Sequence, residues 1–254
     1  MNLNQVLPFV TTTIMFVFVV LVSGRYLQHR SWHLLMWSIG LTLFAVASLA
    51  EAISTFGFND VVFRLWYLFG AVLTAAWIGQ GTVYLLFRRR WGNITLATLV
   101  LLSLIAAGLM FTMPLDPAAV SRFDPARSLS VQYQASGSTP GLIPAGVPIR
   151  GMTAIFNIYG TLVLVGGAIY STYLFWRKRV MGNRVIGNIL IAVGALIIAT
   201  ASTLARIGNG EFLYLGELLA AITMFAGFLV ASRRVNDSLE REPFPTRTQP
   251  APST

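Results

Sequence analysis

The feature that most constrains this chain is a series of long apolar segments, each ending in charged or turn-forming residues. A helix needs about 20 mostly apolar residues to cross a bilayer, and only helices or closed barrels satisfy their backbone hydrogen bonds inside it. The sequence therefore predicts an all-α, polytopic membrane protein with a seven-helix bundle. The expected spans are Val6–Ser23, Trp32–Thr55, Val61–Phe87, Ile94–Met113, Gly151–Trp176, Val185–Arg206 and Glu211–Ser232.

The composition supports a lipid environment, argues against nucleic acid as a partner and excludes cysteine chemistry. Hydrophobic residues make up 56% of the chain and charged residues 11%, whereas a soluble domain is about 25% charged. The net charge of +9 lies in the loops between apolar spans. There it indicates topology and contact with anionic lipid headgroups rather than nucleic acid. The chain has no cysteine, so disulfides, thiolate nucleophiles and Cys-ligated metals are excluded.

The basic residues also predict the orientation. Thirteen of the 18 Lys and Arg residues fall in one set of alternate loops and five in the other. Basic residues collect on the cytoplasmic side of a membrane protein. We therefore expect a plasma-membrane protein with its N-terminus outside and its C-terminus in the cytoplasm.

Two segments are expected outside the bilayer, next to a transmembrane domain over 1–232. The outer loop over 114–150 is rich in Pro, Gly and Ser, and such a segment is either a lid over a cavity or a flexible connection. We expect the flexible connection, because long loops without structure of their own are often disordered. The cytoplasmic tail over 233–254 is expected to extend the last helix to about residue 242 and then to be disordered.

The first three spans resemble the last three, with the fourth as a linker. Tyr26-Leu27 followed by Arg30 matches Tyr173-Leu174 followed by Arg177. Leu68-Phe69-Gly70 matches Tyr214-Leu215-Gly216 at nearly the same offset. Both triplets would cross the membrane in the same direction, which predicts a parallel 3+1+3 repeat.

Polar residues inside the spans gather in the outer third. They are Glu51, Arg64, Asn157, Arg206 and Glu217. A charge inside the membrane costs about 2.5–3.5 kcal/mol on insertion scales and is a functional hypothesis by default. Two interpretations remain open: a polar cavity that binds a ligand, or a structural latch in which a glutamate pairs with an arginine.

The third span carries a further candidate surface. Its polar and aromatic residues recur at steps of three and four and should share one helix face, as a pocket wall or as a packing surface. That stripe comprises Trp66, Gly70, Leu73, Trp77, Gln80 and Tyr84. The candidate ligand-binding residues are therefore Glu51, Arg64, Trp66, Trp77, Gln80, Asn157, Arg206 and Glu217.

The residues that several membrane-embedded reactions require are missing from the expected spans. The only lysine, Lys178, lies in a loop, so a retinal Schiff base in the last span is excluded. His29 and His33 lie at the inner ends of the first two spans without carboxylates at matching depth. We therefore expect no catalytic residues, no metal and no cofactor.

With the N-out, seven-span plan, two stretches carry a resemblance to a known family. They are Ala50-Glu51 through Arg64–Tyr67, and Thr203–Arg206 through Leu215–Leu219. In these features the chain resembles the N-terminal seven-helix sensory modules of bacterial histidine kinases and related signalling proteins. Those proteins carry an output domain after the last helix, whereas about twenty residues follow here. The resemblance thus implies a sensor that signals through a partner.

The 3+1+3 plan is also similar to the small sugar-transporting seven-helix family, whose Pro-Gln motif this chain lacks. The leading expectation is a non-enzymatic prokaryotic sensor or accessory protein. It would bind a small or lipidic ligand in its outer half and contact a cytoplasmic or membrane signalling partner. The alternative is a small-solute membrane transporter.

Overall fold

The computed structural model describes residues 3–135, 139–178, 182–206 and 212–232. Within them, seven helical segments are long and apolar enough to cross a membrane, which confirms the predicted number and makes the chain a multi-pass membrane protein. The long helices are α1 (Leu3–His29), α2 (Trp32–Ser54), α5 (Arg89–Thr112), α8 (Pro148–Lys178), α9 (Gly182–Arg206) and α10 (Leu213–Ser232). The third span is composed of α3 (Asp60–Leu65), η1 (Trp66–Leu73) and α4 (Thr74–Leu86).

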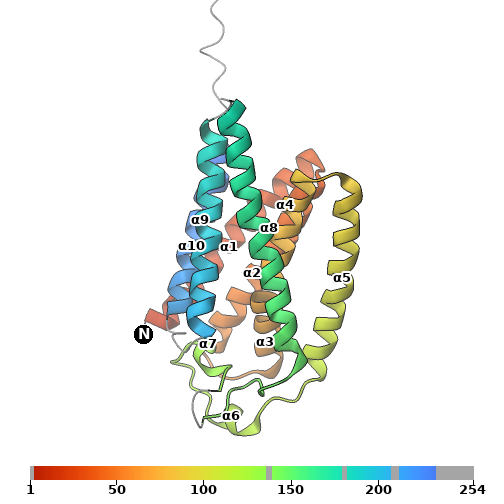
Figure 1. Cartoon of the computed structure of the whole chain (residues 1–254). Helices are drawn as coiled ribbons and strands as arrows, with labels where there is room; N and C mark the ends of the chain where they lie inside the picture. Colours follow the sequence, from red (N-terminus) through yellow and green to blue (C-terminus); the bar gives the residue numbers. More distant parts are fainter. Residues whose placement is uncertain (1–2, 136–138, 179–181, 207–211, 233–254) are drawn as a thin grey trace, which may run out of the picture.

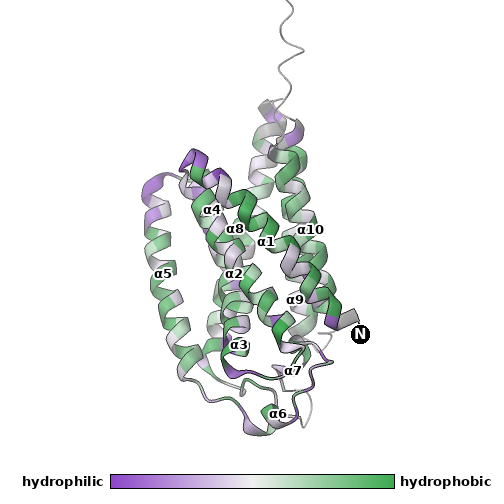
Figure 2. Cartoon of the chain, turned by 180° about the vertical axis from the view of Figure 1, so that it is seen from behind, coloured by the Kyte–Doolittle hydropathy of each residue, from purple (hydrophilic) through white to green (hydrophobic). Residues whose placement is uncertain are grey.

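Six of the spans form a ring. Around it, α1 contacts α2, α2 contacts α4, α4 contacts α8, α8 contacts α9, α9 contacts α10, and α10 returns to α1. Helix α5 stands outside this ring against η1, α4 and α8 (Figure 1). Hydrophilic residues concentrate at the two ends of the bundle (Figure 2). We call the end that carries residues 113–135 and 139–147 the loop end, and the end that carries Arg88–Arg90 the arginine end.

The third span changes its helical geometry partway along. Asn59 caps the N-terminus of α3 by accepting a hydrogen bond from the amide of Val62 at 3.1 Å. The next eight residues, η1, form a π-helix, in which backbone bonds join residues five apart. Side chains supply further bonds to its carbonyls: the Thr74 hydroxyl donates to Phe69 at 2.7 Å, and Asn157 Nδ2 of α8 donates to Ala71 at 2.6 Å. Helix α8 therefore helps to hold the π segment in place.

From mid-span to the arginine end, the helices touch at glycines. A Cβ atom built on Gly79 of α4 would lie 3.2 Å from Cα of Gly160 in α8. One built on Gly194 of α9 would lie 2.5 Å from Met224 Cγ of α10. Small residues allow this close backbone approach between membrane helices. We call Gly40, Gly79, Gly160 and Gly194 the closed layer.

The segment expected to be a flexible connection is instead folded where the structure describes it. It contains α6 (Pro117–Ser121) and α7 (Leu129–Gln132). Leu129, Leu142 and Ile143 are at most 1% exposed, because they pack against the bundle. Their spacing is irregular, so no periodic pattern in the sequence indicated this packing. The helical extension expected over 233–242 lies outside the described residues.

Candidate functional site

A cavity of about 280 Å³ lies inside the ring of helices, between the loop end and mid-span. Phe44, Ile78, Leu164 and Met224 make its deepest, apolar part. Polar and charged side chains line the part nearer the loop end. These include Ser48, Glu51, Thr74, Arg150, Thr153, Asn157, Thr161, Ser202 and Glu217. The cavity is therefore amphipathic along its length, as small-molecule sites commonly are.

Two carboxyl groups lie at this cavity, one from each of the two helices that flank α1. The side chains of Glu51 of α2 and Glu217 of α10 both line the cavity and lie close enough to interact electrostatically. Glu51 is 1% exposed, and its Oε1 accepts a hydrogen bond from Trp66 Nε1 at 2.6 Å. Its other oxygen, Oε2, has no donor among the described residues. Carboxylate oxygens only accept hydrogen bonds, so two ionised carboxylates this close repel each other unless a proton or a cation lies between them.

Three aromatic rings lie next to the carboxyl pair. Trp66 and Tyr67 come from η1, and Tyr133 comes from the segment over the loop end. Their ring centroids lie 6.1 Å (Trp66 to Tyr67), 5.8 Å (Trp66 to Tyr133) and 5.6 Å (Tyr67 to Tyr133) apart. All three residues line the cavity, and we call them the aromatic triad.

The loop-end segment covers the cavity and is fastened to the bundle. The Leu129 amide donates to the Tyr214 hydroxyl of α10 at 3.0 Å. The guanidinium of Arg150, which lines the cavity, donates to the Ile143 carbonyl at 2.6 Å. Because Tyr133 and Gln134 also line the cavity, this segment has the placement expected of a lid.

Four of the eight candidate residues come together at the cavity, namely Glu51, Trp66, Asn157 and Glu217. The amide nitrogen of Asn157 is already bonded to the backbone of η1 and to the Thr153 carbonyl. Asn157 therefore shapes the wall of the cavity, while Glu51 keeps a buried acceptor oxygen, Oε2, without a donor among the described residues.

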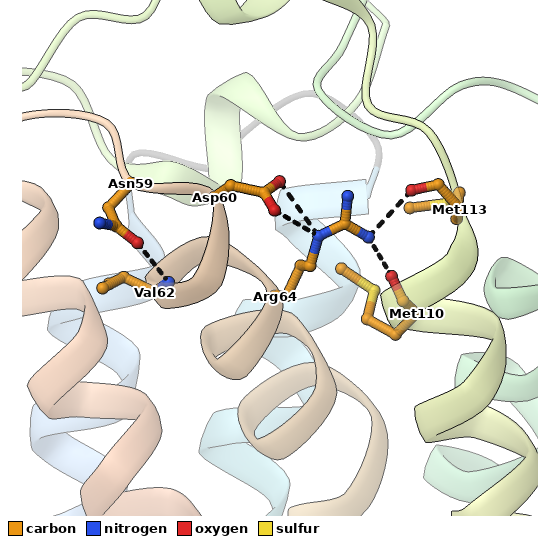
Figure 3. A network of polar contacts seen from close by, with 6 residues as sticks. All are labelled: Asn59, Asp60, Val62, Arg64, Met110 and Met113. Atoms are coloured by element: carbon orange, nitrogen blue, oxygen red, sulfur yellow. Dashed lines mark hydrogen bonds and ion pairs between the residues drawn. The ribbon is translucent and has the colours of Figure 1, made fainter.

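Arg64 does not line the cavity. Its Nε lies 2.9 Å from Asp60 Oδ2, and its Nη1 donates to the carbonyls of Met110 and Met113 at the end of α5 (Figure 3). The latch interpretation, open between Arg64 and Arg206, does not hold for Arg64, because this guanidinium fastens α3 to α5.

Trp77 and Gln80 also lie away from the cavity. Trp77 Nε1 donates to Ser103 Oγ of α5 at 3.3 Å, and Gln80 Nε2 donates to the Gly92 carbonyl at 2.8 Å. The expectation that they share one face with Trp66 is wrong. A π-helix has more residues per turn than an α-helix. Each extra residue in η1 therefore rotates the side chains that follow it by about 100° around the helix axis, relative to Trp66.

Arg206 ends α9, and its side chain lies outside the described residues, as does Glu211. A latch between Arg206 and one of the glutamates therefore stays a prediction. The site residues that the sequence did not indicate are Tyr67, Tyr133 and Arg150. Tyr133 and Arg150 belong to the segment expected to be flexible, and nothing in the local sequence placed them near Glu51.

The arrangement offers a binding site that combines an apolar floor, three aromatic rings and two carboxyl groups. Within the described part of the chain, no group of three or more His, Asp and Glu residues could hold a metal ion. No protein-family model, curated protein or solved structure matches this chain. The function of the site is therefore inferred from its own geometry.

Proposed function

We propose that this protein is a non-enzymatic sensor or accessory protein of a prokaryotic plasma membrane. It binds a small or lipidic ligand in the cavity and signals through a partner. The observation that carries the proposal is the one-sidedness of the cavity, which begins at the loop end and stops at Ile78 and Met224 near mid-span. Beyond it the closed layer brings the helices into contact. A transporter needs a site reachable from both sides.

The distribution of basic residues supports an outward-facing cavity. Arg88–Arg90 and Arg177–Arg179 belong to the basic-rich set of loops, and the positive-inside rule puts that set in the cytoplasm. The loop end then faces outward with the N-terminus. The arginine end and the tail over 233–254 then face a cytoplasmic partner.

Helix α10 offers a route between the two ends. Glu217 lines the cavity near one end of α10. At the other end, the Ser232 carbonyl accepts a hydrogen bond from Arg25 of α1 at 3.2 Å, and the Arg25 guanidinium lies 5.0 Å from the centre of the Phe228 ring. A ligand that changes how Glu217 meets Glu51 would bias the position of α10, and the contact with Arg25 would change with it.

The experiment that tests this proposal identifies the small molecules and lipids that co-purify with the wild type and with two variants. All three proteins are purified gently from native membranes. Ala199→Leu fills the cavity, which Ala199 lines, whereas Thr200→Leu places the same side chain on the exposed face of α9. We expect mass spectrometry to find a stoichiometric small molecule or lipid with the wild type and with Thr200→Leu, and to lose it with Ala199→Leu.

Transport is tested in the same preparation. The alternative, a small-solute transporter, requires the closed layer to open and close, and it predicts solute flux when the purified protein alone is reconstituted in liposomes. Solute flux that Ala199→Leu abolishes would overturn the sensor proposal. A bound ligand without flux would support it.

A further inference from the structure

We propose that the ligand of this cavity is an organic ammonium ion with an apolar body, whose charged end sits between the carboxyl pair and the aromatic triad. This inference rests on the proposed function, because it specifies the chemical class of the ligand that the cavity binds. Three independent features of the cavity support it.

The first feature is the unsatisfied carboxyl pair. The Glu51 and Glu217 carboxyl groups interact electrostatically at the cavity, and Glu51 Oε2 is buried without a donor among the described residues. A buried acceptor without a partner is destabilising, and more so when it is charged. An ammonium group carries up to three N–H donors and a positive charge, so one group can bond both carboxyls. Such charge-assisted bonds are roughly twice as strong as neutral ones.

The second feature is the aromatic triad. A cation near the face of a tryptophan or tyrosine ring is attracted by the ring quadrupole, most strongly where the site is desolvated. Trp66 joins this feature to the first, because its indole nitrogen donates to Glu51 and its ring lines the cavity. Carboxylates alone would also suit a metal ion, whereas carboxylates beside aromatic rings favour an organic cation.

The third feature is the balance of charge along the cavity. Arg150 is the one basic residue among the described side chains that line it, and one guanidinium nitrogen is already bonded to the Ile143 carbonyl. Glu51 and Glu217 outnumber this one guanidinium, so the polar part of the cavity favours a cation. Phe44, Ile78, Leu164 and Met224 then provide an apolar end for the rest of the ligand.

The test uses three probes of equal length and different charge: octylamine, octanol and octanoate. Binding is measured by isothermal titration calorimetry at neutral pH to protein in nanodiscs of zwitterionic lipid, with empty nanodiscs subtracted. We expect octylamine to bind at least about tenfold more tightly than octanol, since a charged hydrogen bond adds about 1.4 kcal/mol over a neutral one. Octanoate should bind most weakly.

Variants test whether the carboxyl pair causes the preference for octylamine over octanol. Glu51→Gln and Glu217→Gln should each remove most of the octylamine preference while octanol still binds. Asp60→Asn removes an acid at the same end of the bundle that does not line the cavity, so the preference should remain. Tyr133→Leu should lower octylamine affinity a few-fold, and Tyr133→Phe, which keeps the ring, should not. Glu217→Gln carries the test if Glu51→Gln fails to fold.

The outcomes separate this inference from the proposed function. Equal affinity for the three probes, or a preference for octanol or octanoate, overturns the ammonium assignment and leaves a ligand-binding cavity intact. An octylamine preference that survives both glutamate variants also overturns it. If no probe binds, the inference is overturned, and the proposed function is then decided by the co-purification and flux experiments.

Discussion

The two halves of the bundle are built from the same helices but packed in opposite ways. Toward the arginine end, neighbouring helices touch at glycines, and a Cβ atom on Gly187 would lie 2.6 Å from the Gly227 carbonyl oxygen. Toward the loop end the ring of helices encloses the cavity, and of the described helices α9 and α10 alone keep a glycine contact this close, at Gly216, where a Cβ atom would lie 2.3 Å from Ala201 Cβ. Helices α8 and α9 lie together at the arginine end and diverge toward the loop end (Figure 1).

The difference shows how a membrane bundle can make room for polar groups. Lipid is as apolar as leucine, so helix association in a membrane depends on close packing and on hydrogen bonds between helices. The half toward the arginine end relies mainly on close packing. The half that encloses the cavity adds buried hydrogen bonds between helices, from Trp66 to Glu51 and between the Tyr67 and Thr153 hydroxyls at 3.1 Å. These bonds satisfy polar groups where the helices enclose the cavity.

The greatest loss of stability should follow a substitution that disrupts the close packing of helices α4 and α8. In Gly160→Ala the new Cβ would lie 2.3 Å from the backbone carbon of Ala75, which cannot move away cheaply. We expect destabilisation of about 2 kcal/mol or more, measured by thermal unfolding in detergent. Gly166→Ala is the matched control on the same helix, because its Cβ would meet nothing within 4 Å. Equal stabilities of the two variants would contradict the close-packing account.

The next prediction tests whether Arg64 stabilises the fold or binds the ligand. Arg64→Gln removes the guanidinium that satisfies the Met110 and Met113 carbonyls. We expect a loss of about 2 kcal/mol in stability with unchanged affinity for octylamine. Arg122→Gln, at an exposed position in the same end of the molecule, should change neither property. Weakened binding in a folded Arg64→Gln variant would make Arg64 part of the site.

A smaller loss of stability is expected at the wall of the cavity. Asn157→Ala leaves the Ala71 carbonyl of the π-helix without its side-chain donor. The expected cost is about 1 kcal/mol in thermal stability. Octylamine affinity should fall too, because η1 carries Trp66 and Tyr67. Thr98→Ala, which removes an exposed hydroxyl bonded only within its own helix, is the control. An unchanged stability would show that the π segment does not depend on α8.

The smallest effect is expected from Asp60→Asn. Asp60 pairs with Arg64 four residues later on the same helix, and its side chain is 54% exposed. Such pairs contribute about 0.3–0.5 kcal/mol, so the melting temperature should hardly change and should respond little to added salt. A large loss would mean that the carboxylate, and not only the two carbonyls, holds Arg64 in place.

Sequence periodicity fails within the third span for a reason that the fold makes clear. Trp66 and Trp77 lie eleven residues apart, which is close to three α-helical turns. That spacing puts them on one face of a regular helix. The π segment between them changes the register, so Trp66 faces Glu51 while Trp77 faces Ser103. No residue type in Trp66–Leu73 marks a π-helix, which depends on contacts such as the one from Asn157.

The seven membrane-crossing helices follow from the sequence alone, because apolar length is a local property that the thickness of the bilayer converts into a span. The sequence also placed Glu51 and Glu217 in the outer third of their helices, since distance along a helix follows from its rise. That these two carboxyls lie together, that Tyr133 joins Trp66 and that Arg64 binds elsewhere follows from the tertiary structure. Those contacts depend on how each helix is rotated, on the π segment and on the folded loop, all of which packing sets between residues far apart in the chain.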